Sequence, residues 1–291
     1  NPSANIELKL SSRVNASLSA EWVNSSGKYK FRYRRVNPAG ELAYDTTAVR
    51  QNGDINATRI EANLYGTLAR GSWTFKVYNY NSERGVPGAI VNNVWRRGER
   101  IWDTNSFAQG RYTGYFGRFT TMNNIKYAFY RTHYVNNDDK QVKIDNLYKQ
   151  REVYFSSSNM YEFTDWLQVS ASYDLMWNTL NADMYGFAKP DRFSNFLSVA
   201  AAIDLPRFKL QASGLGTFIH DKLRGQQSPN DKQVFTPAVF ASFNPLRSTA
   251  DLSLRAFYKK SFRMPTFNDL YYADMGNSKL NPEHVSQYNF G

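Results

Sequence analysis

The chain has 291 residues, no cysteine, and 36 Lys and Arg against 25 Asp and Glu, which gives a net charge of +11. Without cysteine it has neither a disulfide framework nor a thiolate metal site. Its longest mainly apolar stretch, Phe196–Leu205, is far shorter than the roughly 18 residues of a membrane helix, so a helical membrane protein is excluded. The basic residues are spread through every segment, which favours charges along strand faces over a nucleic-acid surface.

Aromatic residues are abundant although the chain is polar on average. There are 20 Tyr, 20 Phe and 6 Trp, yet the mean hydropathy is −0.60. This combination is expected where apolar and polar residues alternate along strands, because averaging then hides an apolar face.

Alternation with a period of two predicts β-strands along the whole chain. Many of the segments are close to the 9–11 residues, roughly, with which a tilted strand crosses a bilayer. In chain order the clearest are Asn5–Leu10, Val14–Trp22, Lys28–Arg34, Trp73–Tyr80 and Leu167–Trp177. Leu197–Leu205 and Asp251–Tyr258 continue the pattern less cleanly.

The connections between these segments are of two kinds. Short ones are Ser11–Arg13, Asn24–Gly27 and Leu205–Arg207. Long polar ones are Asn37–Asn56, Asn81–Gln109, Arg131–Arg151, Asn178–Asn195 and Asp221–Gln233. Short turns alternating with long loops are typical of a barrel with one end in the periplasm and the other outside the cell.

Two architectures are compatible with many alternating strands, a soluble sandwich and a membrane barrel. A sandwich predicts shorter strands with turn signals every 8–12 residues or so. Here aromatic residues recur near strand ends, as in the two girdles of a lipid-facing barrel; they are Trp22, Tyr29, Trp73, Tyr80, Trp166 and Trp177. We therefore predict an all-β fold, a transmembrane antiparallel β-barrel.

The sequence contains no pattern that indicates catalysis. Its three histidines, His133, His220 and His284, are not spaced as metal ligands or as a nucleophile and its base, and no catalytic or nucleotide-binding motif occurs. The acidic stretch Asn136–Asp145 lacks the spacing of a calcium-binding EF-hand and is interpreted as a solvated loop. An outer-membrane hydrolase has no positive support, so we predict a protein that is not an enzyme and has no cofactor.

The end of the chain carries a resemblance to a known family. Phe262–Tyr272 reads FRMPTFNDLYY, Gly276–Glu283 reads GNSKLNPE, and SQYNFG follows. Together they resemble the paired boxes of TonB-dependent outer-membrane receptors, often F-[RK]-x-P, L-Y, G-N and L-x-P-E. Asn81–Gly110 also resembles an early loop-and-strand region of these receptors.

The resemblance implies a 22-stranded barrel that encloses an N-terminal plug domain, with a TonB box exposed to the periplasm. Residues 1–291 would form a partial barrel domain, and the plug and the last barrel strands would lie outside this sequence. The expected location is the bacterial outer membrane, as an integral protein.

The resemblance further implies energised import of a scarce nutrient. TonB, outer-membrane lipid, a small metal chelate or vitamin, and a surface lipoprotein are the expected partners. Haem receptors often carry a histidine between the two boxes, whereas Thr266–Met275 has none and His284 follows the second box. This leaves a ferric siderophore or cobalamin as the leading ligands, with haem weakened. A passive porin and a soluble sugar-binding β-sandwich are the alternatives.

The loop with the two boxes supplies the candidate ligand-binding residues, which are Arg263, Phe267, Tyr271, Tyr272, Asn277 and His284. The aromatic members are expected at an apolar loop tip near the outer mouth, where simple loop packing is an equally good interpretation. Lys30, Arg32 and Arg34 are predicted to line the lumen, where they would pair with a plug or attract an anionic chelate.

Overall fold

A computed structural model describes the chain except for residues 89–97, 138–142, 226, 246–251 and 272–275. The described part is almost entirely β-strand, with one short helix. None of its helices is long and apolar enough to cross a membrane.

The elements follow one another along the chain in this order: β1 (Ser3–Lys9), β2 (Val14–Ser25), β3 (Lys30–Val36), β4 (Leu42–Val49), β5 (Ile55–Leu68), β6 (Gly71–Gly85), β7 (Glu99–Phe116), β8 (Phe119–Asn136), β9 (Ile144–Thr164), β10 (Leu167–Ala182), β11 (Asp191–Asp204), β12 (Phe208–Lys222), β13 (Lys232–Phe243), β14 (Leu254–Arg263), α1 (Phe267–Tyr271) and β15 (Glu283–Phe290).

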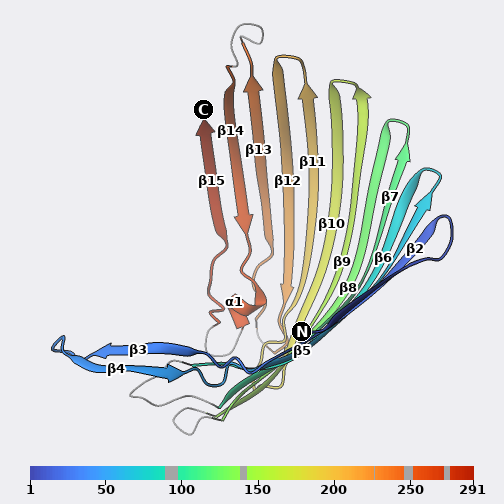
Figure 1. The fold of residues 1–291 in the computed structure, drawn as a ribbon. Coiled ribbons are helices and arrows are strands. Elements are labelled where there is room, and N and C mark those ends of the chain that lie inside the picture. Colours follow the sequence, from blue (N-terminus) through green and yellow to red (C-terminus); the bar gives the residue numbers. More distant parts are fainter. Residues whose placement is uncertain (89–97, 138–142, 226, 246–251, 272–275) are drawn as a thin grey trace.

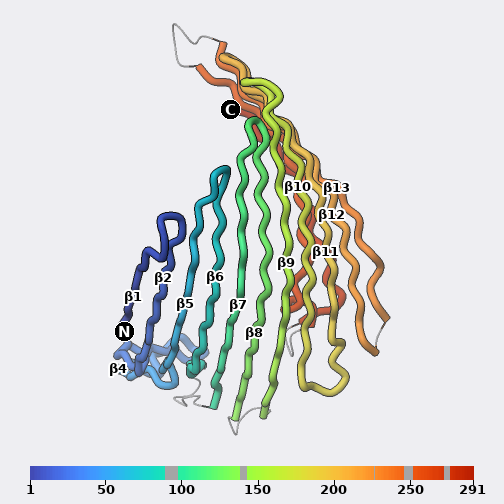
Figure 2. The backbone as a smooth tube through the Cα atoms, turned by 90° about the vertical axis from the view of Figure 1, so that its right-hand side faces the viewer, coloured from blue at the N-terminus to red at the C-terminus, as the bar shows by residue number. Residues whose placement is uncertain are grey.

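Thirteen of the strands form one antiparallel sheet in which each strand pairs with its neighbour in the chain, apart from the excursion between β2 and β5. The sheet is a single curved layer and is not closed (Figures 1 and 2). Tight hairpins gather at one end, which we call the short-turn end. The β3–β4 hairpin and α1 lie at the other, the long-loop end (Figure 1). The predicted barrel-type fold is confirmed, and a two-layered sandwich is not what forms.

The two faces of the sheet differ as the alternation predicts. Val169, Tyr173 and Leu175 of β10 share one face by the two-residue period. Residues directly opposite one another on paired strands also share a face, so Tyr173 lies beside Leu197 of β11, which is 53% exposed. We call this apolar, exposed face the outward face. In an outer-membrane barrel it contacts lipid, and the opposite face lines the lumen.

The strands extend further at the long-loop end than the sequence predicts. β9 contains 21 residues and β7 and β8 contain 18 each, about twice what a bilayer crossing requires. Parts of all five predicted long loops are therefore strand. The physical reason is that both faces of a strand meet water beyond the bilayer, so alternation fades although backbone pairing continues.

One predicted strand lies outside the main sheet. Lys28–Arg34 does form a strand, β3, but it pairs only with β4 in a separate two-stranded sheet. The prediction that Lys30, Arg32 and Arg34 line the lumen is thus wrong. Asn24–Gly27, predicted to be a short turn, instead leads into this hairpin. Alternation alone cannot distinguish a barrel strand from a hairpin with both faces in solvent.

The base of the hairpin is a tight neck. Gly27 has a φ of 58°, and a Cβ on it would lie 1.9 Å from the carbonyl oxygen of Gly53. The side-chain amide of Asn52 donates hydrogen bonds to the carbonyl oxygens of Val86 and Glu99, at 3.0 and 2.8 Å. These contacts hold the hairpin to the ends of β6 and β7.

Candidate ligand-binding site

The lumen face carries charges that are matched in pairs. Within the described residues, basic side chains of β5, β6 and β8 each contact a carboxylate on a neighbouring strand. The pairs are Arg59–Glu21 at 2.6 Å, Lys76–Glu61 at 2.9 Å, Arg84–Asp103 at 3.1 Å and Lys126–Glu152 at 3.1 Å. The wall against which a ligand would pass is therefore polar but locally close to neutral.

The chain between β14 and β15 turns back toward this wall through a short capped helix. Thr266 directly precedes α1, and its hydroxyl accepts a hydrogen bond from the backbone N–H of Asp269 at 3.3 Å. The Asp269 carboxylate in turn accepts from the backbone N–H of Thr266 at 2.8 Å. This is a capping box with Asp in place of Glu, and it satisfies donors that a helix start leaves free. The same N–H and the Thr266 hydroxyl hold the pKa of the Asp269 carboxyl below its ordinary value.

The helix buries its apolar side chains against the lumen wall. Phe267 and Leu270 are 6% and 5% exposed. Phe267 belongs to a buried cluster with Tyr148 of β9 and Leu180 of β10, and Tyr271 packs at the edge of that cluster. Full burial of a Phe or Leu side chain is worth about 1.5–3 kcal/mol, so the contact fixes the position of α1.

A buried ion pair fastens the same segment. The Arg192 guanidinium donates from Nε to Oδ1 of Asp221 at 2.6 Å and from Nη2 to Oδ2 at 2.7 Å. It also donates from Nη1 to the carbonyl oxygen of Pro265, which precedes the helix, at 2.7 Å. The ring of Phe267 lies over the guanidinium, 5.0 Å from its centre. Arg192 thus joins β12, the loop and the helix through one side chain.

Cavities lie on both sides of α1. One of about 500 Å³ extends beneath the helix along β9 to β12, and Glu152, Asn178, Thr217, Phe196 and Phe262 line it. Another of about 510 Å³ includes Tyr130, Thr132 and Asp269. Asn268 borders both cavities. Their size matches that of small-molecule sites in general.

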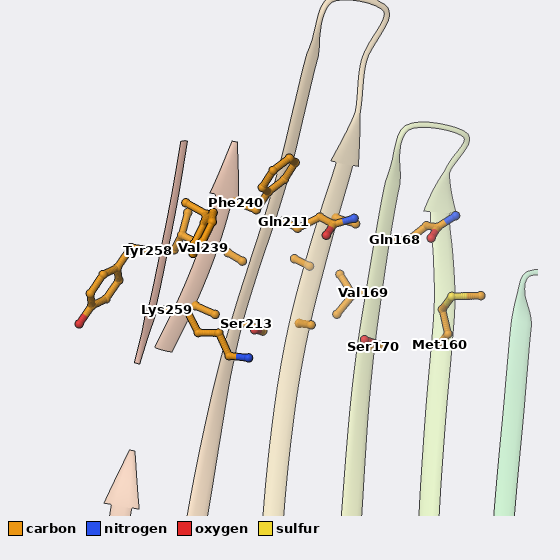
Figure 3. A pocket seen from close by; sticks show the side chains of 16 residues that line it. Met160, Gln168, Val169, Ser170, Gln211, Ser213, Val239, Phe240, Tyr258 and Lys259 are labelled. Carbon is orange, nitrogen blue, oxygen red and sulfur yellow. The ribbon is translucent and has the colours of Figure 1, made fainter. Parts of the chain in front are cut away.

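A third hollow of about 440 Å³ lies on the same wall nearer the short-turn end. In Figure 3 the small side chains Ser170 and Ser213 form its floor, and Gln168 and Lys259 border it. Hollows therefore occur at two heights along the lumen face of β10 to β14.

The structure places the predicted site residues in different surroundings. Phe267 packs on the wall and is no exposed loop tip, and Tyr271 is half-buried beside it. Burial, and then the nearby Asp221 carboxylate, raise the pKa of the Tyr271 phenol, so it stays neutral at physiological pH. Tyr272 lies outside the described residues.

The other predicted residues lie around the same loop. Arg263 is exposed and approaches Glu283 at 3.8 Å. The backbone N–H of Asn277 donates to the carbonyl oxygen of Asp269 at 2.8 Å, so the second box lies beside α1. His284 is the second residue of β15, and its ring lies 5.2 Å from that of Phe262. The contribution of these side chains to ligand binding remains a prediction.

Sequence reasoning missed the residues that hold the loop down, Arg192 and Asp221, and the polar cavity residues Glu152 and Asn178. No local signal distinguishes them, because the residues of each pair are 26 and 29 positions apart and meet only when consecutive strands pair. Half of the acidic stretch predicted to be a solvated loop, residues 138–142, lies outside the described residues, while Asn136 ends β8 and Asp145 lies in β9. Within the described chain no group of three or more His, Asp or Glu is arranged to hold a metal ion.

Comparison with known proteins finds a family match over part of the chain. Residues 175–291 match the family model "TonB dependent receptor-like, beta-barrel". No curated protein matches the sequence. The resemblance to TonB-dependent receptors, the barrel-type fold and the outer-membrane location are confirmed.

Solved structures of receptors have the same fold at low sequence identity. The copper transporter OprC aligns with 96% of this chain at a TM-score of 0.68 and 10% identity. A double mutant of the Serratia marcescens hemophore receptor HasR, in complex with its hemophore HasA and heme, aligns with 99% at 0.68 and 10%. The siderophore receptor PiuA from Acinetobacter baumannii aligns with 99% at 0.66 and 12%. The chain spans about half the length of these proteins, namely 46%, 48% and 52%.

Proposed function

We propose that residues 1–291 form the barrel part of a TonB-dependent receptor that takes up a scarce metal chelate or vitamin across the outer membrane. A ferric siderophore, cobalamin or haem is the ligand class. A plug domain and TonB are the partners that energise transport. The fold and the family match over residues 175–291 support this proposal.

The observation that carries the proposal is the position of the loop with the two boxes. Arg192, Phe267 and Leu270 fold this loop onto the lumen wall, where it covers a cavity of ligand size. A loop that closes over a lumen cavity is suited to selective capture followed by release. Because the fold belongs to transport receptors and not to an enzyme family, it also fits a protein without catalysis.

The paired charges of the lumen wall bear on the ligand. Lys126 is neutralised by Glu152, and Arg192 by Asp221, so the cavity beneath α1 presents little uncompensated positive charge. A neutral ligand surface that donates hydrogen bonds suits this cavity better than a highly anionic one. Among the ligand classes above, this favours cobalamin or a neutral siderophore.

Uptake by intact cells tests the proposal. Cells that express the full-length protein should accumulate one member of a panel of labelled cobalamin, haem, ferric siderophores and copper. The uptake should saturate and should disappear when TonB is removed. Uptake that rises linearly with concentration and does not need TonB would show a passive porin instead.

Binding by the purified receptor gives a second test. Phe267→Ala should weaken binding of the transported ligand, whereas Tyr29→Ala, on the hairpin outside the main sheet, should not. The soluble sandwich is excluded if the protein requires detergent and shows heat-modifiable migration on a gel. A protein that stays folded in buffer without detergent would overturn the proposal.

A further inference from the structure

The outward face carries a cluster of cations that differs from the paired charges of β5, β6 and β8 on the lumen wall. Ile125 and Tyr127 of β8 point outward, with 59% and 47% exposure, and by the two-residue period Arg131 shares their face. Lys149 of β9 lies directly opposite Arg131, and Arg151 is two residues further along. We call Arg131, Lys149 and Arg151 the outer basic cluster.

The cluster lies where the apolar surface ends. The pairs Tyr127–Val153 and Val153–Trp177 form the last level of the outward face at which β8, β9 and β10 all carry apolar side chains. The next levels toward the long loops, Phe129–Arg151 and Arg131–Lys149, carry the cations. Long loops mark the extracellular end of such a barrel. The three cations therefore project at the boundary between the hydrocarbon and the head groups of the outer leaflet.

No carboxylate neutralises the cluster within the part of the chain that the structure describes. All three side chains are exposed, and their neighbours on the adjacent strands are Thr104, Thr179 and Asn181. Like charges directly opposite one another destabilise a pair of strands, so Arg131 beside Lys149 is unfavourable unless an anion bridges them. Four lumen cations, Arg59, Lys76, Arg84 and Lys126, are by contrast each paired with a carboxylate.

A hollow of about 290 Å³ adjoins the cluster on the same face. Arg131 forms one border, and Thr58, Asn81, Trp102 and Thr104 line the rest. The Thr104 hydroxyl donates to Oδ1 of Asn81 at 3.0 Å, and Glu83, which also borders the hollow, pairs with Arg100 at 2.8 Å. Hydroxyls, amides and an indole ring beside free cations are suited to a phosphorylated sugar.

We propose that this part of the outward face binds the phosphorylated head group of an outer-leaflet glycolipid. The phosphate would bridge Arg131, Lys149 and Arg151, because charge-assisted hydrogen bonds from Arg and Lys to phosphate are strong. The sugar would enter the hollow beside Trp102, and the acyl chains would run along the apolar surface below Tyr127. The proposal concerns anchoring in the membrane and does not depend on the transported ligand.

Native mass spectrometry of the full-length protein in detergent tests the proposal, with bisphosphorylated lipid A as the probe. The triple variant Arg131→Gln, Lys149→Gln, Arg151→Gln should bind lipid A at least about tenfold more weakly, because it loses the charge-assisted hydrogen bonds to the phosphate. The matched control is Arg13→Gln, Arg70→Gln, Arg207→Gln, which removes three exposed cations at the short-turn end and should bind like the unmodified protein.

Dephosphorylated lipid A separates the head group from the acyl chains. It should bind the unmodified protein about as weakly as lipid A binds the triple variant. Equal binding of both lipids, unchanged binding by the triple variant, or an equal loss in the control would each overturn the proposal. Heat-modifiable migration shows that a variant is folded, and Lys149→Gln alone replaces the triple variant if that one does not fold.

Discussion

Two segments leave the main sheet at the long-loop end, the segment around α1 and the β3–β4 hairpin. We call them the two excursions, and they place similar side chains in opposite environments. The segment around α1 buries Phe267 and Leu270 against the lumen wall and joins Arg192 to Asp221 and Pro265. The β3–β4 hairpin leaves Tyr29 60% exposed and pairs Arg32 with Asp45 in solvent. Aromatic and basic residues therefore do not fix a loop by themselves. What fixes it is a surface that removes them from water and satisfies their polar groups.

The largest expected effect is on the buried ion pair. Arg192→Ala leaves the Asp221 carboxylate buried without its partner, which typically costs about 3–5 kcal/mol, so α1 should detach from the wall. Residues 1–291 contain no cysteine, so Leu270→Cys provides the single labelling site in this part of the protein. Its reaction with a maleimide should become much faster in the Arg192→Ala background.

The matched control is Arg32→Ala, which removes the exposed pair with Asp45. Labelling at position 270 should not change in that background. If Arg192→Ala also leaves the labelling rate unchanged, the ion pair does not hold the helix.

The next effect concerns aromatic burial. Phe267→Ala removes a buried ring and its contact with the Arg192 guanidinium, and comparable core substitutions cost about 3–5 kcal/mol. The rate at which a maleimide labels Leu270→Cys should rise in this background, as it should with Arg192→Ala. Tyr29→Ala on the hairpin should change stability by no more than about 0.5 kcal/mol, as measured by thermal unfolding in detergent. If Phe267→Ala and Tyr29→Ala changed stability equally, the segment around α1 would be no more firmly packed than the hairpin.

A smaller effect is expected at the hairpin neck. Gly27→Ala places a Cβ against the Gly53 carbonyl in a backbone region that favours glycine, with strain of about 1–3 kcal/mol. Tryptic cleavage between Lys28 and Arg35 should become faster, while α1 stays docked. Gly53→Ala is the milder comparison, because its Cβ would lie 3.2 Å from the Gly27 oxygen. Similar cleavage rates in both variants would contradict the neck geometry.

The smallest effect concerns the cap of α1. Thr266→Ala removes the N-cap hydroxyl and should weaken docking of α1 by about 1 kcal/mol.

The Asp269 carboxylate of the same cap should make docking sensitive to acid. Because its pKa is depressed in the folded protein, the carboxylate stabilises docking fully above its ordinary pKa of about 3.9. This stabilisation is lost as pH falls through the lower folded pKa. A fluorophore attached at Asn268→Cys should report docking from pH 7 to about 4 and a change only below that. Asp269→Asn should abolish this acid transition, and a transition near neutral pH would exclude Asp269 as its cause.

The fold could be predicted from the sequence wherever lipid lies on one side of a strand and the lumen on the other. Val169, Tyr173 and Leu175 alternate with polar residues because each face has its own solvent. The predicted strand Leu167–Trp177 therefore covers the first 11 of the 16 residues of β10. The polar parts of β7 and β9 beyond the bilayer were predicted as loops, because water surrounds both faces there. The strand Lys28–Arg34 was predicted for the right reason and assigned to the wrong sheet.

The candidate site was predictable only in part. The two boxes identified the loop with Phe267 and Tyr271, because their residues are adjacent in the sequence. The wall on which it rests was not predictable, since Arg192 and Asp221 come from different strands and meet only once β11 and β12 pair. The outer basic cluster has the same origin, because Arg131 and Lys149 become neighbours only through the register of β8 and β9.

A cysteine scan of β10 from Gln168 to Leu175 tests the central claim most directly. We predict a two-residue period in the full-length protein reconstituted in lipid. Cysteines at 169, 171, 173 and 175 should carry labels that brominated lipids quench, and those at 168, 170, 172 and 174 should react with a water-soluble maleimide. Labels at 169 and 175 that neither lipid nor water reaches would mean that both residues face a dry protein interior, and the outer-membrane barrel would be the wrong structure for this chain.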